Sequence, residues 1–203
     1  MIFDHDDTAL LLIDYQKGFC EPDGSMARQG RDIGALAAAA EAGNRLAAAA
    51  RSRGCPVIWT RMVFASDYSD GGVLTTVLRP NLAKIGALAR GSGDEELASI
   101  CDVLPGDLVI DKPRFSSLIG TPLEVILRSA GIGSVVVAGV TTPMCVESTV
   151  RDLSQRDYAV TVVADACADF ERERHEAALA AMAFGFAHVV ECADILTQDK
   201  QAG

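Results

Sequence analysis

Short, unbroken apolar runs separated by helix-like segments constrain the fold of this 203-residue chain more than any other feature. The runs LLLI (10–13), VVVA (135–138) and VTVVA (160–164) lack the apolar–polar alternation of a strand with one face in water. Such runs are typical of parallel strands that are covered on both faces. The chain is therefore predicted to form an α/β fold with an open, mainly parallel six-stranded sheet and helices on both sides.

The predicted elements alternate along the chain. The predicted strands are Thr8–Asp14, Pro56–Val63, Leu108–Asp111, Val135–Val140, Val160–Ala164 and His188–Glu191. The predicted helices are Asp32–Arg53, Pro122–Ala130, one that carries Cys145 and ends near Arg156, and Glu171–Phe184. The connection 64–106 is irregular, with weak helical signals near 81–90 and 95–103, and its length is typical of a lid, a substrate loop or an oligomer contact.

The net charge excludes some classes of partner. The chain has 18 Lys and Arg against 28 Asp and Glu, a formal charge of −10 at pH 7. Nucleic acid and membrane surfaces are not expected as partners, because their phosphates would be repelled. An anionic small molecule would need a local cation, such as Arg61 or Arg114. The length and the 49% hydrophobic content suit one domain with a sizeable core.

The cysteines indicate a reducing environment. Neither a CxxC pair nor zinc-ligand spacing occurs among the six, which are Cys20, Cys55, Cys101, Cys145, Cys167 and Cys192. The sequence shows no signal-peptide pattern and no apolar run of membrane-spanning length. We therefore expect reduced thiols and a cytoplasmic location.

Three residues with useful chemistry follow predicted strands. Asp14 closes the first strand, Lys112 closes the third, and Cys145 comes after the fourth. The carboxyl ends of parallel strands meet at one edge of the sheet, where ligands bind, so we expect these side chains to converge. Taken singly, each has an ordinary alternative: a capping aspartate, a solvated lysine, or a buried cysteine that fills space.

The position of Cys145 favours a reactive thiol. Thr142 suits a helix N-cap and Pro143 the first helical position, which places Cys145 in the first turn. The positive end of the helix dipole and the cation of Lys112 are both predicted to favour the thiolate. Asp14 would take the thiol proton and return it to the leaving nitrogen, as general base and then general acid.

Backbone amides around Thr141 and Cys145 are expected to form an oxyanion hole, in which each donor contributes about 3 kcal/mol. The hydroxyl of Thr142 would compete with this role if it capped the amide of Cys145. No GxSxG serine motif is present, and no histidine is placed for a Cys–His dyad, so the base is expected to be a carboxylate. Structural or surface roles are expected for His5, His175 and His188.

Three motifs, in this order, resemble the isochorismatase-like cysteine hydrolases. They are ALLLIDYQKGF (9–19), DKPRFSSLIGTPLEVILRSAGI (111–132) and VVVAGVTTPMCVESTVRDL (135–153). The resemblance runs from about Thr8 to Glu191 and weakens in the 64–106 segment. It implies a three-layer α/β/α sandwich, a single domain over residues 1–203, and assembly as a homodimer or homotetramer.

The same resemblance assigns roles to individual residues. It implies a catalytic triad of Asp14, Lys112 and Cys145. It also implies a cis peptide between Val140 and Thr141, which would aim the amides of Thr141 and Cys145 at the oxyanion.

Departures from the family's pattern narrow the expected activity. The stretch WTRMVFASDYSD (59–70) has no histidine, whereas nicotinamidases carry a metal-binding Asp-x-His and a further histidine there, so no metal and no cofactor are expected. True isochorismatases are similar in VADACADFERERH (163–175) but lack the nucleophilic cysteine, so Cys145 favours C–N bond cleavage. The stretches KPRFSS, TPLEVILRSAGI and MCVESTVRD look most like ureidoacrylate and biuret hydrolases, which act on small carbamoyl or ureido compounds.

Six side chains are expected to bind substrate: Gln16, Phe19, Trp59, Arg61, Tyr68 and Phe115. Gln16 belongs to the family's D-x-Q pattern and is expected to orient the catalytic carboxylate. For Trp59 and Phe115, packing in the core or in an interface is an open alternative. Asp165, at the end of the fifth strand, is expected to support local structure.

The sequence thus leads to one hypothesis and two rivals. The hypothesis is a metal-independent cysteine hydrolase that cleaves the C–N bond of a small linear amide, ureide or carbamoyl compound through a thioester-type acyl-enzyme. The first rival is an isochorismatase-type vinyl-ether hydrolase that uses Asp14 as the acid. The second is a catalytically silent homologue that only binds.

Overall fold

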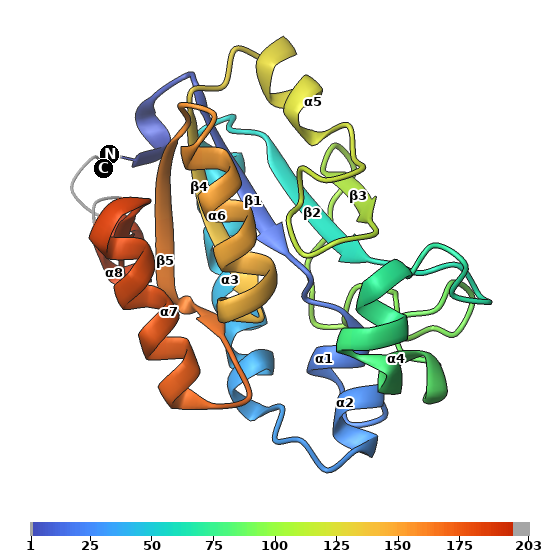
Figure 1. Cartoon of the computed structure of the whole chain (residues 1–203). Coiled ribbons are helices and arrows are strands. Elements are labelled where there is room, and N and C mark those ends of the chain that lie inside the picture. Colours follow the sequence, from blue (N-terminus) through green and yellow to red (C-terminus); the bar gives the residue numbers. More distant parts are fainter. Residues whose placement is uncertain (1, 197–203) are drawn as a thin grey trace.

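A six-stranded sheet forms the centre of the computed structural model, which describes residues 2–196 (Figure 1). The strands are β1 (Thr8–Ile13), β2 (Val57–Met62), β3 (Leu108–Lys112), β4 (Ser134–Val140), β5 (Ala159–Ala168) and β6 (His188–Val190). Their order across the sheet is β3-β2-β1-β4-β5-β6, and every neighbouring pair is parallel. The predicted α/β sheet is confirmed.

The strand order creates a switch point between β1 and β4. From β1 the chain adds β2 and β3 on one side, then returns to add β4, β5 and β6 on the other. Connections that leave two adjacent strands in opposite directions open a crevice beyond the carboxyl ends of those strands. The residues that follow β1 and β4 are therefore placed at the usual ligand site of such a sheet.

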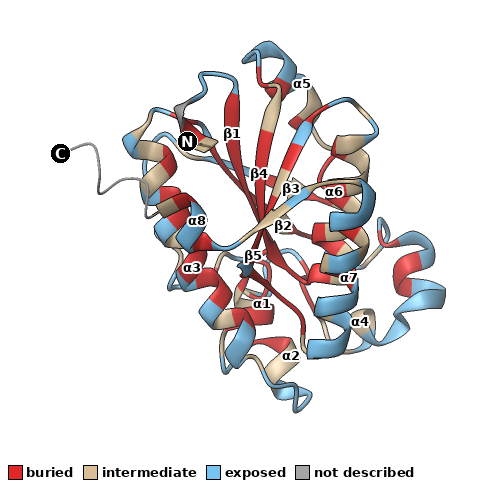
Figure 2. Cartoon of the chain, turned by 90° about the vertical axis from the view of Figure 1, so that its left-hand side faces the viewer, coloured by how far each residue is buried: buried red, intermediate tan, exposed pale blue. Residues whose placement is uncertain are grey.

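Helices cover both faces of the sheet, which gives three layers. Figures 1 and 2 show α3 and α8 on one face and α6 and α7 on the other. The helices are α1 (Lys17–Cys20), α2 (Ser25–Arg28), α3 (Gly34–Ser52), α4 (Pro80–Lys84), α5 (Leu123–Ser129), α6 (Glu147–Ser154), α7 (Arg172–Gly185) and α8 (Cys192–Leu196). A short 3-10 turn spans Ile2–Asp4, and π-helical turns span Leu74–Leu78 and Thr142–Val146.

The core lies between the sheet and these helices. Every residue of β1 is buried, which explains its unbroken apolar run, and Figure 2 shows the burial of the central strands. The alanine-rich face of α3 packs closely on the sheet because its side chains are small. At Gly43 a side chain would not fit, since a Cβ there would lie 2.6 Å from the ring of Tyr15.

The 64–106 segment differs most from its predicted structure. The helical signal at 81–90 corresponds to α4 and the turn after it, whereas the signal at 95–103 is wrong. The backbone there bonds to residues beyond β1 instead: Lys17 N–H donates to Glu96 at 2.8 Å, and Ala98 N–H donates to Tyr15 at 2.8 Å. These tertiary hydrogen bonds replace those that a helix would make.

Three further features bear on the sequence-based expectations. The strand β5 is longer than predicted and continues past Ala164 to Ala168, which places Asp165 inside the strand. Its carboxylate accepts a hydrogen bond from the Cys192 amide at 2.7 Å. All six cysteines are free. Within residues 2–196, no helix combines the length and apolarity needed to cross a bilayer.

Candidate active site

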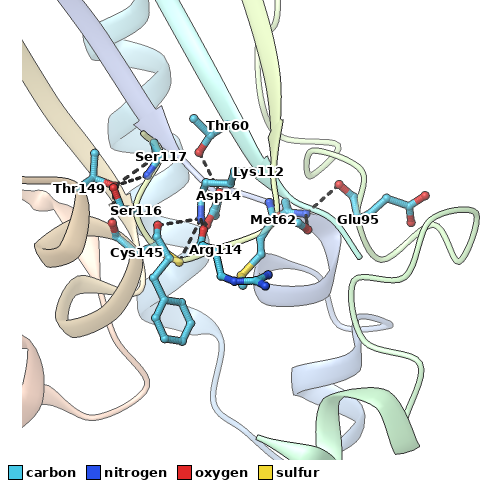
Figure 3. A network of polar contacts seen from close by, with 12 residues as sticks. Asp14, Thr60, Met62, Glu95, Lys112, Arg114, Ser116, Ser117, Cys145 and Thr149 are labelled. Atoms are coloured by element: carbon cyan, nitrogen blue, oxygen red, sulfur yellow. Dashed lines mark hydrogen bonds and ion pairs between the residues drawn. The ribbon is translucent and has the colours of Figure 1, made fainter. Parts of the chain in front are cut away.

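The ammonium group of Lys112 contacts both Asp14 and Cys145 (Figure 3). Its Nζ lies 2.7 Å from Oδ2 of Asp14 and 3.4 Å from Sγ of Cys145. The side chains of Asp14 and Lys112 have no exposed surface, and Cys145 is 3% exposed. The structure therefore brings the three predicted residues together at the carboxyl edge of the sheet, where Asp14 follows β1, Lys112 ends β3 and Cys145 comes after β4.

Asp14 is held by the turn that follows β1. Its backbone has a positive φ of 57°, a conformation that aspartate adopts more readily than most residues. The hydroxyl of Thr60, on β2, donates to Oδ1 of Asp14 at 2.8 Å. Gln16 does not contact this carboxylate; its amide bonds to the backbone of Met62 and Glu95 at 2.8–2.9 Å. Thr60 thus orients the carboxylate, and Gln16 fixes the surrounding chain.

Lys112 is a buried cation with a complete set of partners. Besides Asp14 and Cys145, its ammonium donates to the carbonyls of Arg114 and Phe115, both at 3.0 Å. Burial is the largest single influence and would lower the pKa of Lys112, but the charges and hydrogen bonds of Asp14 and Cys145 together outweigh it, and the pKa is raised above its ordinary value. Lys112 therefore stays charged and forms an ion pair with Asp14.

Cys145 lies in the π-helical turn Thr142–Val146, at the start of the segment that continues into α6. Burial raises the pKa of its thiol, Lys112 lowers it, and the charge of Asp14 raises it again, so that the pKa is well above the ordinary value. The prediction that the free site favours the thiolate is therefore wrong. The burial of Cys145 depends on tertiary packing and could not be predicted from the sequence. The thiol therefore needs a base to remove its proton before the sulfur can attack a substrate.

Thr142 differs from its predicted role as a helix N-cap. The N-cap position belongs to Thr141, which makes no side-chain cap, and Thr142 is the first residue of the turn. The Thr142 hydroxyl lies 2.8 Å from Nδ1 of His175, on α7, so its observed partner is not the amide of Cys145. The predicted cis peptide between Val140 and Thr141 is confirmed.

A cavity of about 200 Å³ opens beside Cys145. Most of its lining is apolar: Phe19, Met26, Met62, Leu82, Leu88, Phe115, Met144 and Phe170. The remaining lining residues are Arg31, Arg79, Thr141, Cys145, Asp169 and Arg174. Of the three residues, Cys145 is thus the one that lines the cavity, and the buried pair of Asp14 and Lys112 lies outside its lining.

The expected substrate residues divide into two groups. Phe19 and Phe115 line the cavity, whereas Gln16, Trp59, Arg61 and Tyr68 lie outside its lining. Trp59 is buried and donates to Asp107 at 2.9 Å, and Arg61 pairs with Asp111 at 2.7 Å.

Tyr68 also has a hydrogen-bond partner outside the cavity lining, since its hydroxyl donates to the carbonyl of Ala87 at 2.7 Å. Of the expected set, the structure therefore places only Phe19 and Phe115 at the cavity. Sequence reasoning missed the methionines and leucines of the lining, as well as Arg31, Arg79, Asp169 and Arg174. Their positions depend on how the 64–106 segment and the 169–174 turn pack, which no local pattern signals.

The residues that the structure describes contain no group of three or more His, Cys, Asp or Glu side chains placed to hold a metal ion. The cations suggested for an anionic ligand are also engaged: Arg61 by Asp111, and Arg114 by the carbonyls of Asp70 and Pro113.

A cavity at the switch point of a parallel sheet, with a thiol in its wall and a charged pair behind it, places this chain among the α/β enzymes. The family model of the Isochorismatase domain matches residues 8–194. The chain belongs to the isochorismatase family.

Individual relatives agree with this assignment. The ureidoacrylate amidohydrolase RutB of Methylorubrum extorquens is 36% identical over 176 residues, which are 81% of this chain and 71% of that protein. RutB of Methylobacterium radiotolerans is 36% identical over 185 residues, or 85% and 72% of the two chains. A crystal structure of a cysteine hydrolase from Pseudomonas syringae pv. phaseolicola has a TM-score of 0.87 and 28% identity, with 98% of this chain and 94% of that chain covered.

Proposed function

We propose that the protein is an amidohydrolase that cleaves a non-peptide C–N bond in a small amide, ureide or carbamoyl compound, with Cys145 as nucleophile and without a metal. The observation that carries the proposal is the contact of one buried ammonium with both the Asp14 carboxylate and the Cys145 sulfur. The names of the relatives, which are amidohydrolases of ureidoacrylate, support the bond type and the ureide class.

The first half-reaction begins with proton transfer. Asp14 takes the proton from the Cys145 thiol, and the sulfur attacks the substrate carbonyl carbon to form a tetrahedral oxyanion. Lys112 stabilises the thiolate as it forms, because its positive charge lies 3.4 Å from the sulfur. The intermediate then collapses, the C–N bond breaks, and Asp14 returns the proton to the leaving nitrogen. The products are a free amine and an acyl group bound to Cys145 as a thioester.

Water completes the cycle. Asp14 accepts a proton from a water molecule that attacks the thioester, and the second tetrahedral intermediate releases the acid and the Cys145 thiolate. The proton on Asp14 then restores the thiol. The backbone amides of Thr141 and Cys145 are the proposed oxyanion donors in both steps, and each contributes about 3 kcal/mol. Thr141 and Cys145 both line the cavity, which supports this assignment.

The turn that carries Cys145 is anchored by His175, which we infer to be a positioning residue. Replacing His175 by Phe keeps the ring but removes the hydrogen bond to Thr142, and we expect kcat to fall about tenfold with little change in KM, since a small misplacement of reacting groups is costly. His175→Asn keeps a polar atom near Nδ1 and is expected to restore most of the rate. Steady-state kinetics checks both variants.

A double-mutant cycle with Thr142→Val provides the control for this inference. If the hydrogen bond between Thr142 and His175 is responsible for the fall in kcat, His175→Phe lowers kcat little further in a Thr142→Val background. Fully additive losses, or equal losses in His175→Phe and His175→Asn, would show that the ring acts only through packing.

The substrate class is tested by ammonia release from a panel of ureides, carbamoyl amino acids, maleamate, nicotinamide and biuret. We expect carbamoyl and ureido compounds to be turned over and nicotinamide to be poor. The panel is run before and after dialysis against EDTA. Activity that is lost and then restored by zinc would contradict the metal-independent mechanism, and turnover confined to nicotinamide would contradict the proposed substrate class.

A further inference from the structure

The cavity wall is more apolar than a small polar ureide requires. Three phenylalanines, Phe19, Phe115 and Phe170, line the cavity, together with methionines and leucines such as Met26 and Leu82. A ligand that leaves this apolar wall in contact with water gains little binding free energy from the wall. A hydrocarbon group that packs against the wall strengthens binding through the hydrophobic effect. The wall therefore selects for an apolar group on the substrate.

Three arginines interrupt this wall, and two of them have carboxylate partners. Arg174 lies 2.6 Å from Asp169, and Arg31 lies 3.6 Å from Glu171. Arg79 contacts no carboxylate in residues 2–196; its guanidinium lies 3.7 Å from the sulfur of Met144, the residue before Cys145. Arg79 is thus a cation in the same cavity lining as Cys145, and its charge-assisted hydrogen bonds to a carboxylate are still available.

The overall charge of the chain makes this cation more significant. At a formal charge of −10, the protein repels anions, so an anionic substrate binds only where a local cation compensates. The arginines named from the sequence, Arg61 and Arg114, are engaged elsewhere. Arg79 is exposed at the cavity, which keeps its guanidinium accessible to a ligand.

We propose that the substrate is amphipathic: an amide or ureide with an apolar side group that packs on the phenylalanine wall and a carboxylate that pairs with Arg79. The inference rests on the proposed amidohydrolase function and makes its substrate class specific. Carbamoyl derivatives of α-amino acids with aliphatic side chains have this chemistry. The cavity of about 200 Å³ limits the length of the side group.

Ligand binding to the Cys145→Ala variant tests this proposal without turnover. Calorimetry is done with N-carbamoyl derivatives of glycine, 2-aminobutyrate, norvaline and norleucine, and with the matched carboxamides. We expect affinity to rise about fourfold per added methylene until the cavity is full. In the same background, Arg79→Gln is expected to weaken the binding of the carboxylate ligands roughly tenfold to hundredfold. The affinity for the matched carboxamides is expected to stay nearly unchanged. Arg79→Lys is expected to retain part of the preference for carboxylates over carboxamides.

Arg90→Gln is the matched control, because Arg90 lies in the same segment but pairs with Asp111 at 3.2 Å and is outside the lining. Affinity that is independent of side-chain length would overturn the apolar part of the proposal. Equal weakening of carboxylates and carboxamides by Arg79→Gln, or the same effect from Arg90→Gln, would overturn the role of Arg79. Turnover by the unmodified protein is measured separately, so a failure of the proposed function is seen as binding without hydrolysis.

Discussion

Replacing Cys145 by alanine is expected to reduce amide turnover by about 10⁴-fold or more, because Cys145 is the only thiol in the cavity lining of the described residues. The measurement is ammonia release under single-turnover conditions, with an amide or ureide that the unmodified protein hydrolyses. Cys145→Ser is expected to be almost as inactive, since a hydroxyl is a far poorer nucleophile without a strong base.

Cys101→Ala is the control for this experiment, because Cys101 is a partly buried cysteine outside the cavity lining. We expect it to keep nearly full activity. Substantial turnover by Cys145→Ala would instead favour the rival vinyl-ether hydrolase, in which Asp14 donates a proton and the thiol is not needed. If the unmodified protein shows no turnover and Cys145 is alkylated no faster than the other cysteines, the silent binding homologue is favoured.

Replacing Lys112 by methionine is expected to have two separable effects. The first is on reactivity: Lys112 lowers the pKa of the Cys145 thiol, so its removal raises that pKa and reduces the thiolate fraction at any given pH. The pH midpoint for alkylation of Cys145 by iodoacetamide therefore moves upward. Turnover is expected to fall by about 10²-fold or more, because the charge opposite the reacting sulfur is lost.

The second effect is on stability. Without Lys112, the buried carboxylate of Asp14 has no counter-ion, and the free energy of unfolding is expected to fall by about 3–5 kcal/mol. Adding Asp14→Asn removes the unpaired charge and is expected to recover much of this loss in urea denaturation, but not the activity. Lys17→Met is the control, since Lys17 forms an exposed pair with Glu96. An unchanged alkylation midpoint in Lys112→Met would rule out Lys112 as the activating cation.

The convergence of Asp14, Lys112 and Cys145 could be predicted from the sequence because it follows from the positions of the strands. Apolar runs located β1, β3 and β4, and the carboxyl ends of parallel strands meet at one edge. The catalytic roles expected of these three residues came from the family resemblance as well. The pKa of Cys145 was beyond reach, because burial by residues distant in sequence determines it.

Most of the residues that line the cavity could not be predicted from the sequence. Successive side chains of a strand point to opposite faces, and on β2 the residues that approach the site are Thr60 and Met62 rather than Trp59 and Arg61. Trp59 and Arg61 were expected to bind substrate because of their aromatic and charged side chains, but they lie on the opposite face of β2 from Thr60 and Met62. Arg79 lies in a segment with weak helical signals, and only its packing against Met144 reveals its place.

The position of β3 at the border of the sheet has a consequence for the durability of the protein. Lys112 comes from a strand that pairs with β2 alone, and two of its outer residues, Leu108 and Val109, are exposed. Opening of this one strand would withdraw the ammonium while the rest of the molecule stays folded. If this strand opens first on warming, activity is lost before the rest of the molecule unfolds, and engineering for a longer working life should begin at the outer end of β3, around Leu108 and Val109.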